Sequence, residues 1–236
     1  MTEPSLTGRI ALVTGASRGI GAATAEALAL EGAHVILTAR TAADLEAAEE
    51  RIHQAGGTAT IAPLDLIETD SVARLAAAVA ERWGRLDLLM LNAATLGSLA
   101  PTAQIDGKEF SRVLTLNVLA NQALIAGFDP LLRKSEAGRL LAVTSSVGRQ
   151  PRAYWGAYGA SKAALETLVL SYAEEVRNIS PVRVAIVDPG STATVMRARA
   201  FPGEDPATLK PPGAVAEAVV ALLRRGFETG ERLEVR

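Results

Sequence analysis

Short runs of apolar residues alternate along the chain with longer segments in which apolar residues recur every three or four positions. The short runs are typical of buried strands, and the longer spacing is typical of helices with one buried face. The first forty residues show this order: an apolar run over 9–14, a glycine-rich turn, an Ala- and Leu-rich segment to about residue 31, and a second run over 33–39. The pattern predicts a strand–helix–strand unit at the start of the chain.

The alternation continues to the end of the chain. Thr69, Asp70 and Ser71 can cap a helix that runs to about residue 83. Strands that alternate with helices pair in parallel, because each helix returns the chain to the same end of the sheet. The sequence therefore predicts an α/β fold with a doubly wound parallel sheet of about seven strands and helices on both faces. Further strands are expected over 58–64, 86–91, 139–144, 181–187 and 232–236, and further helices over 42–55, 71–83, 107–133, 158–178 and 213–225.

The predicted elements follow one another without a break that would separate two domains. No Pro- or Gly-rich linker divides the chain, and a length of 236 residues suits one α/β domain. We therefore expect a single domain over 1–236. The segment 191–212 is long, rich in Pro, Gly and charge, and contains Met196 and Phe201, so we expect a mobile substrate loop there.

Composition excludes several classes of protein. Apolar residues make up 49% and charged residues 21% of the chain, which argues against disorder, and a net charge of −2 does not favour nucleic acid as a partner. No cysteine is present, and the two histidines, His34 and His53, are too few for a histidine-rich metal site, so no metal is expected. The chain also has no signal-peptide core and no apolar run long enough to cross a membrane, which favours a cytoplasmic protein.

The turn after the first strand has the spacing Gly15-x-x-x-Gly19-x-Gly21. Glycines at the start of a helix let backbone N–H groups approach a pyrophosphate, which favours a dinucleotide site and a Rossmann-like fold. NAD binders place an acid after the second strand, but Arg40 stands there instead. Arg40 and Arg18 could bind a 2′-phosphate, so we expect NADP(H) to be preferred over NAD(H). The alternative is two solvated surface arginines.

Polar residues follow several predicted strands. Asp65, Asn92, Ser145 and Asp188 each come at the carboxyl end of a strand, and ligands of open α/β sheets bind outside those ends. Each residue by itself could be a helix cap or a turn former. Together they predict that the binding site lies at this end of the sheet.

Tyr158 and Lys162 are four residues apart and share one face of a predicted helix. A lysine ammonium lowers the pKa of a nearby tyrosine, which is about 10 when free. The Ser145 hydroxyl, at the end of a predicted strand, could hold a substrate oxygen beside the phenol. The tyrosine could then exchange a proton with that oxygen. Taken alone, the pair favours the plainer interpretation, a half-buried tyrosine and a solvated lysine.

Taken in order, these motifs resemble the short-chain dehydrogenase/reductase family over essentially the whole chain. Asn117 matches the position of the family's catalytic asparagine, and Ser145 lies thirteen residues before Tyr158, as the family's catalytic serine does. Tyr158-x-x-x-Lys162 is the family signature. The strings 145–162 and 189–209 resemble a bacterial subgroup that is known only as oxidoreductases.

The resemblance implies a role for each of these residues. Tyr158 would be the general acid in carbonyl reduction and the base in alcohol oxidation. Lys162 would lower the pKa of Tyr158 and bind the nicotinamide ribose, Ser145 would orient the substrate oxygen, and Asn117 would hold a water that links Lys162 to solvent. The family usually has glycine where this chain has Ala94. The implied cofactor contacts are Gly15, Ser17, Arg18, Gly19, Ile20, Gly21, Arg40, Asp65, Leu66, Asn92, Ala93, Ala94, Tyr158, Lys162, Pro189, Gly190, Thr192 and Thr194.

The leading hypothesis is an NADPH-dependent oxidoreductase acting on a small-molecule carbonyl or alcohol. The alternatives are an NAD-dependent alcohol dehydrogenase and a non-catalytic dinucleotide-sensing module, which would be expected to lose catalytic residues. The resemblance also implies a homodimer or homotetramer formed by the helices that hold Asn117 and Tyr158. Arg149 and Arg152 leave room for an acidic group on the substrate. An apolar or aromatic substrate is suggested by Leu96, Leu99, Tyr154, Trp155, Met196 and Phe201 in the segments 93–101, 149–157 and 191–201.

Overall fold

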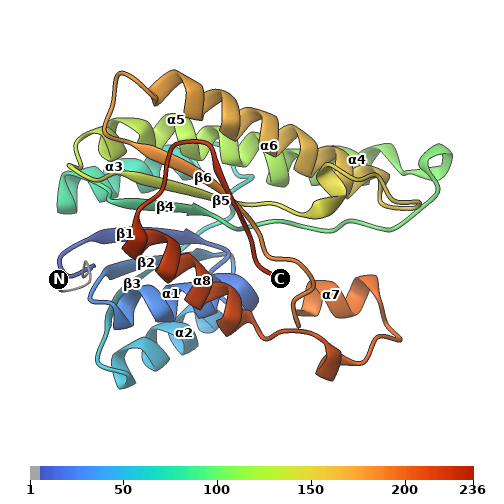
Figure 1. Ribbon diagram of the computed structural model, residues 1–236, viewed down its shortest axis with the longest axis horizontal. Coiled ribbons are helices and arrows are strands. Elements are labelled where there is room, and N and C mark those ends of the chain that lie inside the picture. The colour runs from blue at the N-terminus through green and yellow to red at the C-terminus, as the bar shows by residue number, and fades with distance from the viewer. Residues whose placement is uncertain (1–5) are drawn as a thin grey trace.

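The computed structural model describes residues 6–236, and within them all strands join one parallel sheet (Figure 1). The strand order is β3-β2-β1-β4-β5-β6-β7, so the chain winds outward in both directions from β1 and β4. This confirms the predicted doubly wound α/β fold. The strands are β1 (Ile10–Thr14), β2 (His34–Ala39), β3 (Thr58–Pro63), β4 (Leu88–Leu91), β5 (Arg139–Val143), β6 (Arg183–Asp188) and β7 (Glu231–Glu234).

Helices cover both faces of the sheet (Figure 1). One face is covered by α1 (Gly19–Leu30), α2 (Ala42–Gln54) and α8 (Pro212–Arg225), and the other by α3 (Ser71–Trp83), α4 (Gly107–Leu114), α5 (Ala120–Arg133) and α6 (Gly156–Val176). The short helix α7 (Val195–Ala200) lies outside these layers. No helix within residues 6–236 combines the length and the apolarity needed to cross a bilayer.

The core consists of two apolar clusters, one on each face of the sheet. Successive side chains of a strand point to opposite faces, so Leu12 of β1 joins the cluster under α3, α5 and α6, while Val13 joins the one under α1, α2 and α8. Both residues are completely buried. Strands that are buried on both faces carry continuous apolar runs, which is why these strands were visible in the sequence.

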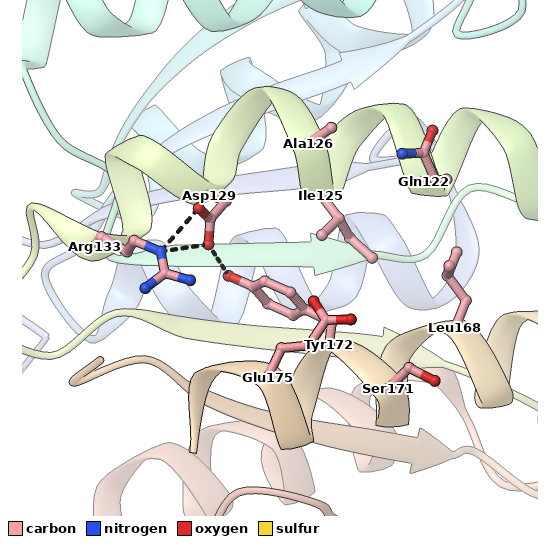
Figure 2. Close-up of a pocket in the computed structure, with 9 residues that line it drawn as sticks. All are labelled: Gln122, Ile125, Ala126, Asp129, Arg133, Leu168, Ser171, Tyr172 and Glu175. Atoms are coloured by element: carbon pink, nitrogen blue, oxygen red, sulfur yellow. Dashed lines mark hydrogen bonds and ion pairs between the residues drawn. The ribbon is translucent and has the colours of Figure 1, made fainter. Parts of the chain in front are cut away.

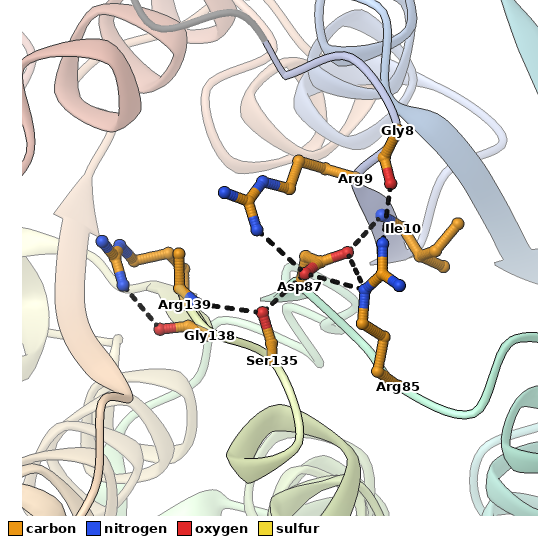
Figure 3. Close-up of polar contacts among 9 residues, drawn as sticks. Gly8, Arg9, Ile10, Arg85, Asp87, Ser135, Gly138 and Arg139 are labelled. Carbon is orange, nitrogen blue, oxygen red and sulfur yellow. Dashed lines mark hydrogen bonds and ion pairs between the residues drawn. The ribbon is translucent and has the colours of Figure 1, made fainter.

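Asp87 joins several segments at the amino ends of the central strands (Figure 3). Its carboxylate accepts hydrogen bonds from the Ile10 amide at 2.8 Å and from the Ser135 hydroxyl at 2.5 Å. It also forms ion pairs with Arg9 at 3.3 Å and Arg85 at 3.2 Å. Burial would raise the pKa of Asp87, but these hydrogen bonds and charges outweigh it and hold the pKa below its usual value. Asp87 therefore links the segments at the end of the sheet that lies opposite the predicted binding site.

The structure differs from the sequence prediction in several elements. The helix predicted over 107–133 is interrupted by a π-helical segment at Thr115–Leu119. The helix predicted to follow Thr69, Asp70 and Ser71 begins at Ser71, but Asp70 at its N-cap position makes no capping side-chain hydrogen bond and has a left-handed φ of 60°. The last strand is Glu231–Glu234 rather than 232–236. The segment 191–212 is not simply a loop, because it contains α7 and a 3-10 turn at Pro206–Thr208; its mobility stays a prediction.

Candidate active site

The glycine turn between β1 and α1 is packed too tightly to accept side chains. A Cβ added at Gly21 would lie 2.2 Å from the carbonyl oxygen of Gly15, and one added at Gly15 would lie 3.0 Å from the Cα of Ala93. Asn92, which follows β4, donates from Nδ2 to the carbonyl oxygen of Thr14 at 2.8 Å. The Thr14 hydroxyl in turn accepts the amides of Asn92 and Ala93. The turn is therefore held from both strands, and its backbone can closely approach an anion at the helix start.

The segment after β6 lies against this turn. Gly19 has a φ of 59°, and a Cβ added there would lie 3.5 Å from Cγ2 of Thr194. The Thr192 hydroxyl donates to the carbonyl oxygen of Pro189 at 3.0 Å, and the Gly190 amide donates to Oδ1 of Asp188 at 3.1 Å. The structure thus places the predicted residues Pro189, Gly190, Thr192 and Thr194 in one ordered segment that reaches the glycine turn.

The predicted adenosine end of the cofactor site contains two arginines. Arg18 precedes α1 and Arg40 follows β2; both are exposed, and neither forms an ion pair within residues 6–236. Asp65 follows β3, and its Oδ1 accepts the amide of Ile67 at 3.2 Å, so it closes a turn. Because β1, β2 and β3 are parallel neighbours, these residues stand at the same end of the sheet. Leu66 packs partly buried against the core.

Tyr158 and Lys162 lie in the first two turns of α6, and both are buried, with 7% and 2% of their surfaces exposed. The Lys162 Nζ donates to the carbonyl oxygen of Val143 at 2.8 Å and lies 5.6 Å from the centre of the Tyr158 ring. Burial lowers the pKa of Lys162 to about 8, although the nearby Glu166 carboxylate opposes the change. Lys162 is therefore not the solvated lysine of the alternative interpretation.

The pKa of Tyr158 departs from the prediction. We expected Lys162 to lower it, but burial raises it above its usual value, and the negative charge of Asp188 raises it further. The prediction is wrong for this structure because loss of hydration around the buried phenol disfavours the phenolate. The tyrosine is thus held as the protonated phenol, which is the form that donates a proton.

Ser145 follows β5 and begins the 3-10 turn at Ser146–Gly148. Two glycines let this turn approach α6: a Cβ at Gly148 would lie 3.0 Å from the Ala163 amide nitrogen, and one at Gly159 would lie 3.0 Å from the carbonyl oxygen of Val147. The Ser145 side chain is half-buried, and none of the hydrogen bonds among residues 6–236 uses its hydroxyl. The close packing brings the strand end that carries Ser145 to the start of α6.

Asn117 lies at the centre of the π-helical segment and is completely buried. Its Oδ1 accepts the Thr95 amide at 2.8 Å, and its Nδ2 donates to the Thr95 carbonyl and to the Ser161 hydroxyl, both at 2.9 Å. A single π turn in an α-helix is common at functional sites because it re-aims one side chain. Here Asn117 joins the loop after β4 to α6. It makes no hydrogen bond to Lys162, so its role in a water relay stays a prediction.

A buried charged contact behind the site was not found from the sequence. Glu166, one turn after Lys162 on α6, accepts a 2.5 Å hydrogen bond from the Thr144 hydroxyl and pairs with Arg232 of β7. Thr144 directly precedes Ser145, so the contact fixes the strand end that carries the predicted serine. A signal existed in the spacing, because Tyr158, Lys162 and Glu166 repeat every four residues on one helix face.

Aromatic side chains pack beside the predicted proton donor. The Trp155 ring meets the Tyr158 ring edge-on at 6.0 Å and lies 5.6 Å from the Phe201 ring. Leu96 is buried in the same cluster, with Leu99 and Met196 packed against it. Arg149, expected to leave room for an acidic substrate group, is instead paired with Glu234 at 2.9 Å.

A hollow between the outer faces of α5 and α6 contains none of the predicted site residues (Figure 2). On its floor, the Tyr172 hydroxyl donates to Oδ1 of Asp129 at 2.6 Å, and Arg133 donates to the same carboxylate at 2.8 Å. Burial and the Asp129 hydrogen bond raise the pKa of Tyr172 above its usual value. The hollow is lined by Gln122, Ile125, Ala126, Asp129, Arg133, Leu168, Ser171, Tyr172 and Glu175.

The two histidines take no part in the site. His34 lies at the amino end of β2, where its ring nitrogens lie 3.0 Å from the Thr58 hydroxyl and 2.9 Å from the Thr60 hydroxyl. It therefore stands at the opposite end of the sheet from Ser145. In the part of the chain that the structure describes, no group of three or more acidic or histidine side chains is placed to hold a metal ion.

Comparisons with known proteins agree with this geometry. A model of the short chain dehydrogenase family matches residues 9–205. YciK of Escherichia coli K12, named as an uncharacterized oxidoreductase, is 40% identical over 213 residues, which are 89% of this chain and 84% of that protein.

Two similar crystal structures contain a nicotinamide cofactor. A short chain dehydrogenase from Shigella flexneri 2a complexed with NADP has a TM-score of 0.93 and 38% identity, with 99% of each chain covered. A short chain dehydrogenase from Escherichia coli CFT073 complexed with NADPH has a TM-score of 0.90 and 39% identity, covering 98% of this chain and 97% of that one.

Proposed function

This chain belongs to the short-chain dehydrogenase family and is an NAD(P)-dependent oxidoreductase, and from that premise we propose that it is an NADPH-dependent carbonyl reductase in which Tyr158 is the general acid. The observation that carries the proposal is the position of Tyr158. Its phenol is buried, and Lys162 Nζ lies 5.6 Å from the centre of its ring, at the sheet end where the glycine turn lies. A phenol beside a lysine ammonium at the cofactor end of the sheet is suited to give its proton to a carbonyl oxygen, because the ammonium stabilises the phenolate that forms.

The residues of the turn and the neighbouring strand ends fit a phosphorylated dinucleotide. The backbone at Gly15, Gly19 and Gly21 would hold the pyrophosphate, and the segment 189–194 would border the nicotinamide end. Arg18 and Arg40, exposed and without ion pairs in residues 6–236, would bind the 2′-phosphate. When bound, the cofactor supplies the hydride.

The protein's own groups then position the substrate and supply the proton. The Ser145 hydroxyl, which has no other hydrogen-bond partner in the described chain, would hold the carbonyl oxygen beside Tyr158. Tyr158 would protonate that oxygen. Lys162, charged below a pKa of about 8, would stabilise the phenolate that is left and bind the ribose. Asn117 would keep the loop after β4 in place against α6.

Replacement of Tyr158 by Phe tests the general-acid role. The Tyr158→Phe variant should lose kcat by about a hundredfold or more, because general acid catalysis contributes that much. NADPH binding, followed by the enhancement of its fluorescence, should change little. Tyr172→Phe is the matched control, because it removes a buried hydroxyl from the same helix at a distance from the site. Turnover retained by Tyr158→Phe would exclude this role.

The cofactor preference is tested at Arg40. Arg40→Asp should weaken NADPH binding by tenfold or more and affect NADH much less, because it replaces a phosphate ligand with an acid that can accept a ribose hydroxyl. Arg199→Asp, a change of an exposed arginine on α7, is the control. An equal kcat/KM for NADH and NADPH in the unaltered protein would contradict the proposed preference.

Two alternatives make different predictions. An NAD-dependent alcohol dehydrogenase would oxidise alcohols with NAD faster than it reduces carbonyls with NADPH, which the raised pKa of Tyr158 disfavours at neutral pH. A non-catalytic sensor would bind NADPH and turn over no carbonyl in a panel of ketones, aldehydes and ketoacyl thioesters. The panel therefore separates all three functions.

We further propose that the enzyme is a cytoplasmic homodimer or homotetramer that pairs through α5 and α6. Leu119, the last residue of the π-helical segment before α5, is 60% exposed, and Ala160 and Ala164 are small, exposed residues of α6, the helix that also lines the hollow of Figure 2. Small residues allow close contact between helices. Ala164→Arg should shift the sedimentation coefficient to that of the monomer. A monomer in the unaltered protein would refute this assembly.

A further inference from the structure

Two aromatic rings, those of Trp155 and Phe201, pack in succession beyond the predicted proton donor Tyr158. The Trp155 ring is 6.0 Å from the Tyr158 ring and 5.6 Å from the Phe201 ring, and it is tilted by 32° to the latter. Trp155 comes from the segment before α6, and Phe201 comes from the end of α7. Together with Leu96, Leu99 and Met196 these rings form an apolar cluster around Tyr158.

Three arginines come from the segments that carry these rings, and two of them have carboxylate partners. Arg197 lies 3.9 Å above the Phe201 ring and is paired with Glu204. Arg149 is paired with Glu234. Arg152 is exposed, and within residues 6–236 it has no ion pair and no side-chain hydrogen bond. Its guanidinium carbon lies 6.0 Å from the centres of both the Trp155 and the Phe201 rings.

The backbone around Arg152 is held in a costly conformation. The Trp155 amide donates to the carbonyl oxygen of Arg152 at 3.1 Å, and Tyr154 in this turn has a φ of 73°. A β-turn with positive φ at its third residue ordinarily has glycine there, and a bulky residue in this region costs on the order of 1 kcal/mol. The Tyr154 carbonyl accepts the Ala100 amide at 3.1 Å, which ties the turn to the loop after β4. The turn therefore presents Arg152 at a defined place.

We propose that Arg152 binds an anionic group of the substrate, a carboxylate or a phosphate, while the apolar body of the substrate lies along Trp155 and Phe201. The inference rests on the proposed carbonyl reduction at Tyr158 and names the substrate class for that site. The Arg152 guanidinium carbon lies 6.0 Å from the centre of the Trp155 ring, and that ring centre lies 6.0 Å from the centre of the Tyr158 ring. The substrate is thus an aldehyde or ketone with an apolar or aromatic spacer and a charged end. A planar guanidinium over aromatic rings keeps its edge free for bidentate contact with either anion.

Matched aldehydes test the proposal with NADPH as the reductant. The acids are 4-formylbenzoate and 4′-formylbiphenyl-4-carboxylate, each compared with its methyl ester, and 4-formylphenyl phosphate separates phosphate from carboxylate. Arg152→Met should lower the acid-to-ester ratio of kcat/KM about fivefold to tenfold at low salt, a modest effect because the guanidinium is exposed and its charge is screened. The intrinsic reactivities cancel, because the same ratio is compared between two proteins.

Arg199→Met serves as the control, because it removes an exposed arginine from α7 that contacts neither ring. It should leave the ratio unchanged. An acid-to-ester ratio that Arg152→Met does not alter, for both spacer lengths and for the phosphate, would overturn the anionic subsite. If the esters are nevertheless reduced, the proposed carbonyl reductase stands and only the subsite fails.

Binding gives a readout that does not depend on turnover. The chain has two tryptophans, so in a Trp83→Phe background the fluorescence reports Trp155 alone. The acids should quench it at a lower concentration than the esters, and Arg152→Met should abolish the difference. Anion binding of this kind without any reduction would support the subsite and refute the proposed reaction. Equal quenching by acids and esters would contradict the subsite.

Discussion

The buried contact between Glu166 and Arg232 yields a quantitative prediction. The Glu166 side chain is 8% exposed and that of Arg232 is 21% exposed. The carboxylate is bonded on one side to the Thr144 hydroxyl at 2.5 Å and on the other to the Arg232 guanidinium. The perturbation is a double-mutant cycle that combines Glu166→Gln and Arg232→Met.

The expected magnitude follows from burial. Removal of one partner from a buried ion pair costs about 3–5 kcal/mol, because the other charge is left without a partner. Arg232 keeps some access to water, and the amide introduced by Glu166→Gln would retain an oxygen for the Thr144 hydroxyl, so we expect a cost of about 2 kcal/mol for this variant. The double variant should cost less than the sum of the single variants, with a coupling free energy of about 2 kcal/mol.

Urea unfolding measures the cycle, at one protein concentration because assembly contributes to apparent stability. Arg51→Met is a useful control, because its ion pair with Glu26 is exposed, and we expect it to cost well below 1 kcal/mol. A coupling below about 0.5 kcal/mol would show that Glu166 and Arg232 do not act as a buried pair.

The Glu166→Gln variant should also change the pH dependence of catalysis. Glu166 raises the pKa of Lys162, which burial lowers to about 8. Without the carboxylate the pKa of Lys162 should fall further, so Lys162 loses its charge at a lower pH. The upper limb of the pH profile of kcat for carbonyl reduction should move to lower pH in Glu166→Gln. If this limb does not shift, the carboxylate of Glu166 does not raise the pKa of Lys162.

Further predictions concern stability, cofactor binding and the π-helical segment. Asp87→Asn should lower the free energy of unfolding by about 3 kcal/mol at neutral pH. The pKa of Asp87 is lowered in the folded protein, so the stability that its carboxylate contributes is present above the usual pKa of 3.8 and is lost as the pH falls through the folded pKa. Urea unfolding of both proteins should therefore show a gap that narrows below that pH. Gly21→Ala should prevent NADPH binding or destabilise the fold, since its Cβ would lie 2.2 Å from the Gly15 carbonyl oxygen; calorimetric titration of a folded variant with unchanged affinity would contradict this packing. Asn117→Leu should lower the thermal midpoint by several degrees and kcat with it, because the Thr95 amide and carbonyl lose their partners, and an unchanged midpoint would exclude this bracing role.

The sequence by itself determined the architecture and most of the site's position. Strands that are buried on both faces are largely apolar, so β1, β2 and β5 could be predicted from short apolar runs. Parallel strands present their carboxyl ends together, so Asn92 and Ser145 could be assigned to one end of the sheet before their neighbours were known. The glycine turn could be predicted from its spacing alone, because a backbone that packs closely against its neighbours needs glycine at those positions.

Only the tertiary structure decided the features that depend on burial and on contacts across the sequence. Glu166 and Arg232 are separated by 66 residues, and no local pattern pairs them. The sequence left room for an acidic substrate group at Arg149, whereas the structure pairs Arg149 with Glu234, which is 85 residues away along the chain. The pKa of Tyr158 had the opposite sign from the prediction, because the spacing to Lys162 reveals a neighbouring charge but not the loss of water around the phenol. The sequence shows which residues are charged and how they are spaced. The solvation of each group, and with it the pKa, depends on the atoms that the fold places around it.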